Sequence, residues 1–313
     1  MCASGGRGFV RLHPPARPIA GDVFLPGSKS ITNRALIAAA LARGASRLEN
    51  ASHSDDAAVL IDALSKLGIA CRWERQAVIV EGRGGAFTPY RGTIDVGAAG
   101  TAMRFLAALC CFVPESEILL QGTARMHERP IGPLVAALRT LGADIRCPLR
   151  EGFPPLLIRG KCSYRGGRVA MQGDVSSQFF TSLLLAAPLF EAGLEIEVQG
   201  VQASPSYIDV TGSVMRDFGV NVENRDYRLY RAAPAQGYAA GAVRIEGDAS
   251  GASYFWGAAA LGGGRVRVHN LDAGSPQGDV RFAGLLARMG CGVEAGSSGG
   301  TPWLEVRGAA QLQ

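Results

Sequence analysis

The chain has 313 residues and a mass of 32.7 kDa, which is enough for about two domains with sizeable cores and argues against disorder. Hydrophobic residues make up 47% and charged residues 19%, a soluble globular composition that fits neither collagen nor a coiled coil. The net charge of +5 comes without a run of lysine and arginine, so nucleic acid is not predicted as a partner. No apolar stretch approaches the roughly 18 residues that cross a bilayer, and the N-terminus lacks an apolar signal core. We therefore expect a cytoplasmic protein without a membrane partner.

A repeat of roughly 74 residues divides the sequence into four similar units. Each unit begins with a short strand that ends in glycine, at Gly27, Gly97, Gly173 and Gly247. An apolar segment of helical length and an alternating strand come next, followed by a second helix that ends in glycine, at Gly68, Gly142, Gly219 and Gly290. Two further strands close the unit. The order strand, helix, strand, helix, strand, strand predicts an α/β fold.

The predicted elements recur at matching places in the four units. First strands are expected at 23–27, 93–97, 169–173 and 243–247, and first helices at 35–42, 105–112, 180–190 and 254–262. Second strands are expected at 46–50, 117–121, 195–199 and 265–269, and second helices at 61–68, 135–142, 212–219 and 283–290. The closing strands are clearest at 69–73 with 77–81 and at 220–224 with 227–231. The glycine after each second helix is expected to be left-handed, since such a residue ends a helix without strain.

The repeat also predicts a domain organisation. Right-handed crossovers make the two connected strands of a unit parallel, so both of its turns lie at one edge of the sheet, where ligands bind. Three units can close around a pseudo-threefold axis and bury their apolar helices together, whereas a fourth begins a second domain. The stretch 233–242 is rich in Gly and Ala, lacks charge and marks the boundary. We predict a three-unit substrate-binding domain at 21–240, and a partial second domain made of one unit at 241–313 and an N-terminal strand in 1–20.

Polar turns at this edge predict an anion-binding pocket. The turns at 27–30, 98–101 and 174–178 precede first helices, whose N-termini attract anions, although each turn alone is equally well explained as an N-cap. Basic side chains accompany the turns: Lys29, Arg34, Arg104, Arg125 and Arg129. Arginine suits bidentate contacts with carboxylate or phosphate. The arrangement predicts a pocket for a small substrate with two acidic groups.

Other patterns are not interpreted as sites. The seven cysteines form no Cys-x-x-Cys pair and the four histidines lack metal-ligand spacing, so no metal ion is predicted. The turn at 26–30 lacks the earlier glycine of a nucleotide-binding P-loop. Asp55 and Asp56 immediately precede a helix, and we interpret them as capping residues rather than as a general acid and base.

The motifs at these turns resemble the 5-enolpyruvylshikimate-3-phosphate synthase family, the 3-phosphoshikimate 1-carboxyvinyltransferases. They run from 12 to 308 and include LPGSKSITNRALIAAALA, GAAGTAMRFLAAL, RMHERPIG, GDVSSQFFTSLLLAAPL, SYIDVTGSVMRDFGV, EGDASGASYF and QGDVRFAGLLARMG. The resemblance implies an enolpyruvyl transferase-like fold of two domains with three units each. It implies a shikimate-pathway reaction, on the route to chorismate and the aromatic amino acids. In it, phosphoenolpyruvate transfers its enolpyruvyl group to the 5-hydroxyl of shikimate 3-phosphate, by addition and then elimination of phosphate. It also implies no metal or organic cofactor, and a monomer in the complete form.

The resemblance assigns ligands by matching motif. The residues expected to bind shikimate 3-phosphate are Lys29, Ser30, Arg34, Ser176, Ser177, Gln178, Ser204 and Tyr207. Those expected to bind phosphoenolpyruvate are Lys29, Gly100, Arg125 and Gln178. Within the first set, Ser176, Ser177 and Ser204 would hold the 3-phosphate. The family has six units and this chain has four, so we expect a C-terminally incomplete chain whose acid and base residues lie beyond residue 313.

Two departures and two alternatives accompany the resemblance. Ala98 stands where the family usually has asparagine, and the proline of the turn at 204–207 is shifted by one position. UDP-N-acetylglucosamine 1-carboxyvinyltransferase has the same fold and donor, but it uses a cysteine in the loop matching 122–131, where this chain has none. The other alternative is a non-catalytic binder, or a fragment that binds shikimate 3-phosphate without turning it over.

Overall fold

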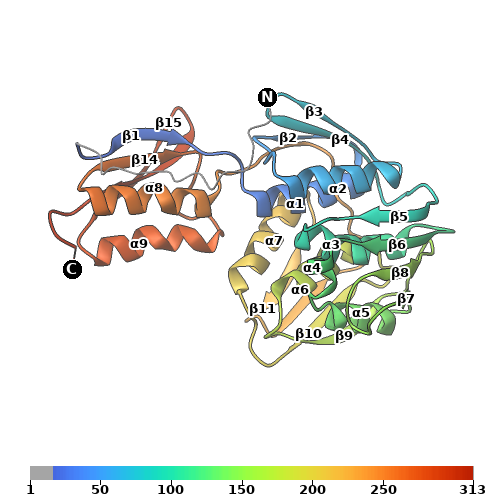
Figure 1. Ribbon diagram of the computed structural model, residues 1–313. Coiled ribbons are helices and arrows are strands. Elements are labelled where there is room, and N and C mark those ends of the chain that lie inside the picture. Colours follow the sequence, from blue (N-terminus) through green and yellow to red (C-terminus); the bar gives the residue numbers. More distant parts are fainter. Residues whose placement is uncertain (1–16, 313) are drawn as a thin grey trace, which may run out of the picture.

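The computed structural model describes residues 17–312, which form two lobes built from four four-stranded sheets and the helices that pack on them (Figure 1). Every sheet has the same spatial order, with a first strand beside the second, fourth and third strands of one unit, although in two sheets the first strand comes from another unit. The first two strands are parallel and the other neighbours are antiparallel. The predicted α/β class and the order of elements within a unit are confirmed.

The elements fall into four successive groups. The first comprises β1 (Ala20–Phe24), α1 (Lys29–Leu41), β2 (Arg43–Glu49), α2 (Asp55–Lys66), β3 (Ala70–Glu74) and β4 (Ala77–Arg83). The second comprises β5 (Arg91–Asp95), α3 (Gly100–Leu109), β6 (Glu117–Gln121), α4 (Ala124–His127), α5 (Gly132–Thr140), β7 (Asp144–Arg146) and β8 (Leu156–Arg159). The third comprises β9 (Gly167–Gln172), α6 (Ser177–Ala186), β10 (Leu194–Gln199), α7 (Pro205–Asp217), β11 (Val222–Arg225) and β12 (Leu229–Ala232). The fourth comprises β13 (Ala242–Arg244), α8 (Ala249–Gly262), β14 (Arg265–His269), α9 (Arg281–Arg288), β15 (Gly292–Ser298) and β16 (Thr301–Arg307). Short 3₁₀ turns occur at Cys110–Phe112, Ala187–Leu189 and Gly278–Val280.

The first strands of units one and four have exchanged sheets, and the expectation that each unit keeps its own first strand is wrong for these two. β1 pairs in parallel with β14, and β13 pairs in parallel with β2. Both strands are short and precede a glycine, Gly27 or Gly247, at the matching position of the repeat, so the sequence does not indicate which sheet each of them joins. The two chain segments meet directly after these strands, where Gly27 and Gly247 form an isolated antiparallel bridge and the N–H of Ser28 donates to the carbonyl of Glu246 at 2.8 Å.

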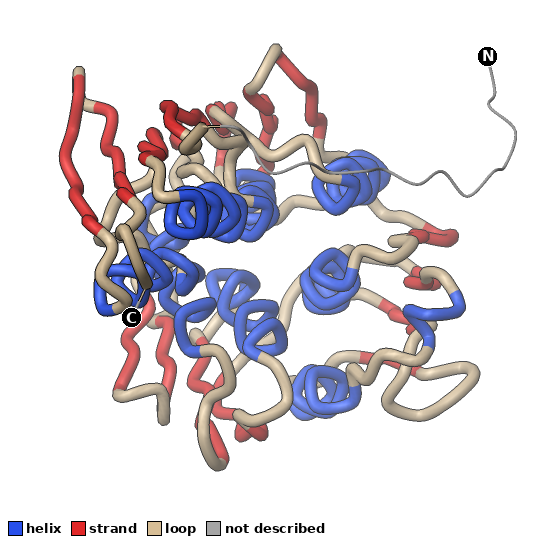
Figure 2. The backbone as a smooth tube through the Cα atoms, turned by 60° about the vertical axis from the view of Figure 1, so that its left-hand side comes forward, coloured by secondary structure: helices blue, strands red, loops and turns tan. Residues whose placement is uncertain are grey.

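Each lobe has a hydrophobic core of its own. In the larger core, α1, α3 and α6 lie against one another and every residue of α1 from Ile31 to Leu41 is buried. The smaller core gathers Leu25 with residues of α8, α9 and their sheet. Figure 2 looks along several of the helices, which run side by side with the strands towards the outside. The two cores agree with two domains, although β1 and Leu25 lie in the smaller lobe and β13 lies in a sheet of the larger one. The bounds 21–240 and 241–313 stay a prediction, and most of the segment 1–20 lies outside the described residues.

The glycines that end the second helices behave as expected. Gly68, Gly142, Gly219 and Gly290 all have φ between 82° and 94°, the left-handed region that ends a helix. Within residues 17–312, none of the helices combines the length and apolar character needed to cross a bilayer.

Candidate functional site

The helix N-termini of units one, two and three meet around one cavity of about 300 Å³. Its lining residues come from the first turns of α1, α3, α6 and α7 and from the turn before α5. They are Ser30, Arg34, Thr101, Arg129, Val175, Ser176, Ser177, Gln178, Ala203, Ser204 and Tyr207. Seven of the eight residues predicted for shikimate 3-phosphate therefore lie around one cavity; Lys29 does not line it. Helix N-termini with serine side chains provide N–H and O–H donors, so the cavity suits an anionic ligand.

Arg34 is buried at the junction between units one and three. Its Nε donates to Thr211 Oγ1 at 2.9 Å, its Nη1 to the carbonyl of Ser30 at 2.8 Å, and its Nη2 to Thr181 and to the carbonyl of Tyr207. Burial lowers the pKa of Arg34 to about 10, which leaves it charged at neutral pH. No carboxylate in the described part of the chain pairs with it. The guanidinium thus fixes α1 to α7 and leaves an uncompensated positive charge beside the cavity.

The first turn of α6 presents side-chain donors to the same space. Ser176 is the N-cap, and its Oγ accepts from the N–H of Gln178 at 3.2 Å. Ser177 is buried and its hydroxyl makes no hydrogen bond with another described residue. The amide Nε2 of Gln178 reaches Thr101 Oγ1 at 3.4 Å, so the side chain joins unit three to the N-terminus of α3. The position of Gln178 between two ligands stays a prediction.

The turn before α7 completes this side of the cavity. Ser204 has φ of 49° and its side chain caps no helix N–H. Tyr207 has an exposed ring, 5.8 Å from the guanidinium carbon of Arg34. Both side chains are therefore available to a ligand rather than committed to the fold.

Lys29 is drawn away from this cavity by a carboxylate. Its Nζ lies 3.5 Å from Asp56 Oδ2, and its side chain is 48% exposed. The interpretation of Asp55 and Asp56 as caps was wrong in detail, because Ser54 is the N-cap of α2 and accepts from the N–H of Ala57. Asp55 and Asp56 occupy the first turn instead, where negative charge is favourable.

The residues expected to bind phosphoenolpyruvate do not all lie around the cavity. Gly100 is the first residue of α3, and its carbonyl accepts from Arg104 Nη1 at 3.1 Å. Arg125 lies on the short helix α4 with 86% of its side chain exposed, and it pairs with Glu128 at 2.6 Å. Arg129, four residues later, is the arginine of this turn that lines the cavity.

Thr101 and Arg129 also line the cavity, and both lie in turns from which the sequence predicts the pocket, although neither is assigned to a ligand there. Both belong to motifs that had been singled out, but spacing along the chain does not tell which side chains of a turn point inward.

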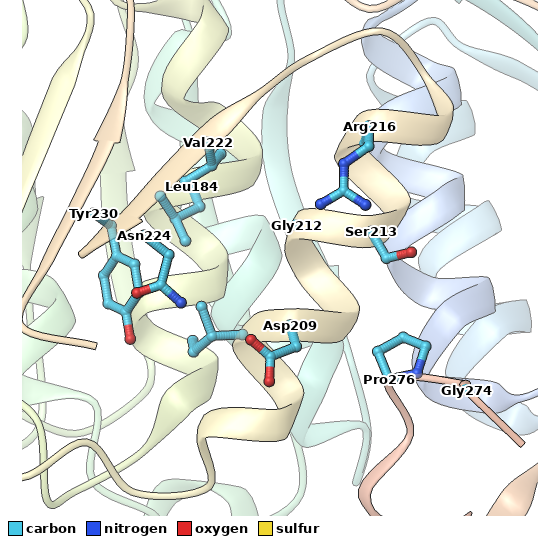
Figure 3. A pocket seen from close by; sticks show the side chains of 11 residues that line it. Leu184, Asp209, Gly212, Ser213, Arg216, Val222, Asn224, Tyr230, Gly274 and Pro276 are labelled. Carbon is cyan, nitrogen blue, oxygen red and sulfur yellow. The ribbon is translucent and has the colours of Figure 1, made fainter. Parts of the chain in front are cut away.

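A second cavity, of about 370 Å³, lies along another face of α7 (Figure 3). Asp209, Ser213 and Arg216 of α7 face it, and Asn224 and Tyr230 line its opposite wall. Asp209 accepts a hydrogen bond from Tyr227 at 2.9 Å. None of the predicted site residues lines this cavity. Within the described residues, no cluster of three or more His, Cys, Asp or Glu side chains could hold a metal ion.

Comparison with known proteins places these observations in a family. The family model described as EPSP synthase (3-phosphoshikimate 1-carboxyvinyltransferase) matches residues 14–308. The chain is 43% identical over 288 residues to a 3-phosphoshikimate 1-carboxyvinyltransferase of a Marinomonas species, and 47% identical over 288 residues to that of Photobacterium profundum. Each alignment covers 91% of this chain but 66% and 67% of the relatives, so the chain spans about two thirds of their length.

The fold is likewise similar to a solved structure. An EPSP synthase from Acinetobacter baumannii superimposes with a TM-score of 0.80 at 22% identity, covering 94% of this chain and 65% of that chain. At this identity the likeness concerns the fold alone.

Proposed function

The chain belongs to the EPSP synthase family, and we propose that it supplies the shikimate 3-phosphate site of an enzyme that transfers the enolpyruvyl group of phosphoenolpyruvate to the 5-hydroxyl of shikimate 3-phosphate, releasing phosphate. One observation carries this proposal: seven of the predicted ligands, contributed by units one and three, surround a single cavity. Ser30 and Tyr207 are far apart in the sequence, yet both line this cavity.

Each part of the cavity has a role in this proposal. The hydroxyls of Ser176, Ser177 and Ser204 hold the 3-phosphate at the N-termini of α6 and α7, where the helix dipoles favour negative charge. Ser30 and Arg34 hold the shikimate side, with the ring of Tyr207 beside it. Because Arg34 is buried, water screens the charge of its guanidinium only weakly, so its electrostatic attraction for a nearby anion is strong.

The phosphoenolpyruvate side lies towards α3. Gln178 bridges the two sides through Thr101, and Gly100 stands at the N-terminus of α3. Lys29, whose Nζ pairs with Asp56, would have to leave that carboxylate to contact the anion. Arg125 would likewise have to leave Glu128. The phosphoenolpyruvate side of the cavity is thus less preorganised than the shikimate 3-phosphate side.

We further propose that the three units of the larger lobe are related by a pseudo-threefold axis and that the fourth begins a second domain. The contacts among α1, α3 and α6 support this arrangement, because the first helices of all three units meet at the centre. We also propose that the protein works as a monomer in the cytoplasm.

The test measures binding and turnover separately. Calorimetry is expected to detect binding of shikimate 3-phosphate to the purified chain, and phosphorus NMR with both substrates measures separately whether the chain releases phosphate. Binding without release would favour the non-catalytic binder. A chain that binds no shikimate 3-phosphate would contradict the proposed function.

A further inference from the structure

The 272–278 segment of the fourth unit lies beside α7 of the third unit. Two of its residues line the second cavity opposite that helix (Figure 3). At its end the backbone lies against the first turn of α7, since a Cβ atom on Gly278 would be 2.8 Å from Oγ of Ser206 and 3.3 Å from its Cβ. Ser206 belongs to the turn at 204–207, which lines the first cavity. A segment of the smaller lobe therefore borders one wall of the proposed shikimate 3-phosphate site.

The side chain of Glu246 holds this segment in place. Its Oε2 accepts a hydrogen bond from Ser275 Oγ at 2.6 Å and another from Gln277 Nε2 at 3.3 Å. Gln277 is buried, and its Nε2 also donates to the carbonyl of Gly247 at 2.9 Å, while its Oε1 accepts from the N–H of Ala249 at 3.1 Å. One carboxylate oxygen thus binds two side chains of the 272–278 segment next to the start of α8.

The backbone of the same residue is bonded to the start of α1. The carbonyl of Glu246 accepts from the N–H of Ser28, the buried N-cap residue of α1, at 2.8 Å. The carbonyl of Ser28 in turn accepts from both the N–H and the hydroxyl of Thr32, at 2.9 and 2.8 Å. Ser30, within this turn, lines the first cavity. Glu246 therefore lies between the 272–278 segment and a second wall of the site.

These contacts do not require the charge of Glu246. Among the described residues no lysine or arginine lies within ion-pair distance of it, and the charged groups that face it are the carboxylates of Asp272 and Asp217. Burial raises the pKa of the Glu246 carboxyl, hydrogen bonds from Ser275 and Gln277 oppose this shift, and the two carboxylates add to it. The carbonyl oxygen of a glutamine can accept the same two hydrogen bonds, so Glu246→Gln separates the bonds from the charge.

We propose that Glu246 is a positioning residue for the shikimate 3-phosphate site, because it joins the 272–278 segment to the start of α1 and keeps it against the start of α7. The inference rests on the proposed function, since it takes shikimate 3-phosphate as the ligand between these two helix starts. Glu246 does not line the cavity, so it acts through the two turns and not by contact with the ligand. Turns that are already held in place lose less conformational freedom on binding, and the ligand binds more tightly.

Calorimetry of shikimate 3-phosphate binding tests this role, at a temperature where circular dichroism shows every variant to be folded. Glu246→Ala should weaken binding about fivefold or more, because the segment loses both hydrogen bonds and the turns lose their support. Glu246→Gln should bind within about twofold of the wild type, since it keeps the acceptor oxygen. Ser275→Ala should weaken binding in the wild-type background but by less than about twofold in Glu246→Ala, where its partner is already absent. The matched control is Glu294→Ala, which removes an exposed carboxylate of the same unit and should bind like the wild type.

Hydrogen exchange of the ligand-free protein gives a second readout. Glu246→Ala should speed amide exchange at 28–31 and 205–208 as well as in the 272–278 segment, whereas exchange in β5 and β6 should not change. Faster exchange confined to the 272–278 segment would overturn the proposed role, because the two turns would then not depend on Glu246.

The binding outcomes separate this inference from the proposed function. A Glu246→Ala variant that melts at a lower temperature but binds like the wild type would show a structural role alone and overturn the proposal. Equal losses of affinity in Glu246→Ala and Glu246→Gln would also overturn it, and so would equal factors for Ser275→Ala in both backgrounds. A wild type that binds no shikimate 3-phosphate would contradict the proposed function, while hydrogen exchange would still decide whether Glu246 positions the two turns.

Discussion

The same position of the repeat is buried in one lobe and exposed in the other. The first three units carry Leu41, Cys111 and Ala187 there, all nearly inaccessible, whereas Leu261 in the fourth unit is 84% exposed. An earlier position of the same helices shows the same difference: Arg34, Arg104 and Phe180 are buried, whereas Tyr254 is 81% exposed. A helix that is apolar on all sides is normally covered on all sides. α8 is apolar all round but packs on one side, so burial here depends on how many units meet and not on the pattern of the helix.

This difference explains why the candidate site lies in the larger lobe. Around α1, α3 and α6 the packing fixes polar residues such as Arg34 and Gln178 from several sides. The fourth unit has an equivalent turn, where Asp248 caps α8 through the N–H groups of Ser250 and Gly251. That turn borders unit one, since the N–H of Asp248 donates to the carbonyl of Pro26 at 3.0 Å, but it does not line the cavity.

The largest expected effect comes from the equivalent leucines. Leu41→Ala removes a buried side chain from the larger core and should lower the free energy of unfolding by about 2–5 kcal/mol. Leu261→Ala removes the same atoms from an exposed position and should change it by less than about 0.5 kcal/mol. Urea denaturation of both variants measures the difference. Similar losses would mean that the face of α8 is covered in solution and that the two lobes do not differ in this way.

A buried carboxylate gives the second contrast. Glu305 is fully buried on β16; burial alone would raise its pKa, but hydrogen bonds from Arg307, Arg267 and Arg265 lower it. Because the folded pKa is lowered, the stabilisation is present above the ordinary glutamate range near pH 4.3 and is lost as pH falls through the lowered value. Glu305→Gln should destabilise the smaller lobe by about 1–3 kcal/mol at pH 7, and the loss should shrink in acid.

The control for this prediction is in the larger lobe. Glu74 also pairs with two arginines, Arg47 and Arg72, but it is exposed. Glu74→Gln should therefore leave stability unchanged, since exposed ion pairs contribute little. Hydrogen exchange in β14 and β16, followed against pH, gives the local measurement. A pH-independent loss in Glu305→Gln would contradict the account of that cluster.

The smallest expected difference concerns the two asparagines that hold the exchanged strands. Asn270 bonds both the N–H and the carbonyl of Leu25, at 3.2 and 2.8 Å, whereas Asn50 bonds the carbonyl of Ile245 alone, at 3.1 Å. Both have φ near 55°, so the backbone strain caused by alanine is the same at the two sites and cancels. Asn270→Ala should cost about 1 kcal/mol more than Asn50→Ala. Equal losses in urea denaturation would show that the additional bond to Leu25 adds nothing.

The sequence predicted those features that depend on local patterns. The order of elements within each unit follows from alternating strands and helix-ending glycines, and Gly68 and its three counterparts adopt the expected conformation. The gathering of Ser30, Ser176 and Ser204 at one cavity follows from the right-handed crossovers, which place all these turns at one edge.

Features that depend on tertiary choice were not predictable in this way. β1 and β13 occupy the same position of the repeat, so the sequence alone does not indicate that each pairs with the second strand of the other unit. The pairing of Lys29 with Asp56 joins two turns whose charges could each have faced a ligand or solvent. Arg129 lines the cavity whereas Arg125 pairs with Glu128, a difference in side-chain orientation within one turn that spacing along the chain does not contain.

The central claim is that the cavity between units one and three binds shikimate 3-phosphate, and titration calorimetry of three proteins tests it most directly. Ser177 and Ser213 are both serines without side-chain hydrogen bonds to described residues, but Ser177 lines this cavity and Ser213 lines the second one. We predict that Ser177→Ala weakens shikimate 3-phosphate binding about tenfold while Ser213→Ala binds like the wild type. Unchanged affinity in Ser177→Ala, or a loss confined to Ser213→Ala, would contradict the assignment of the site.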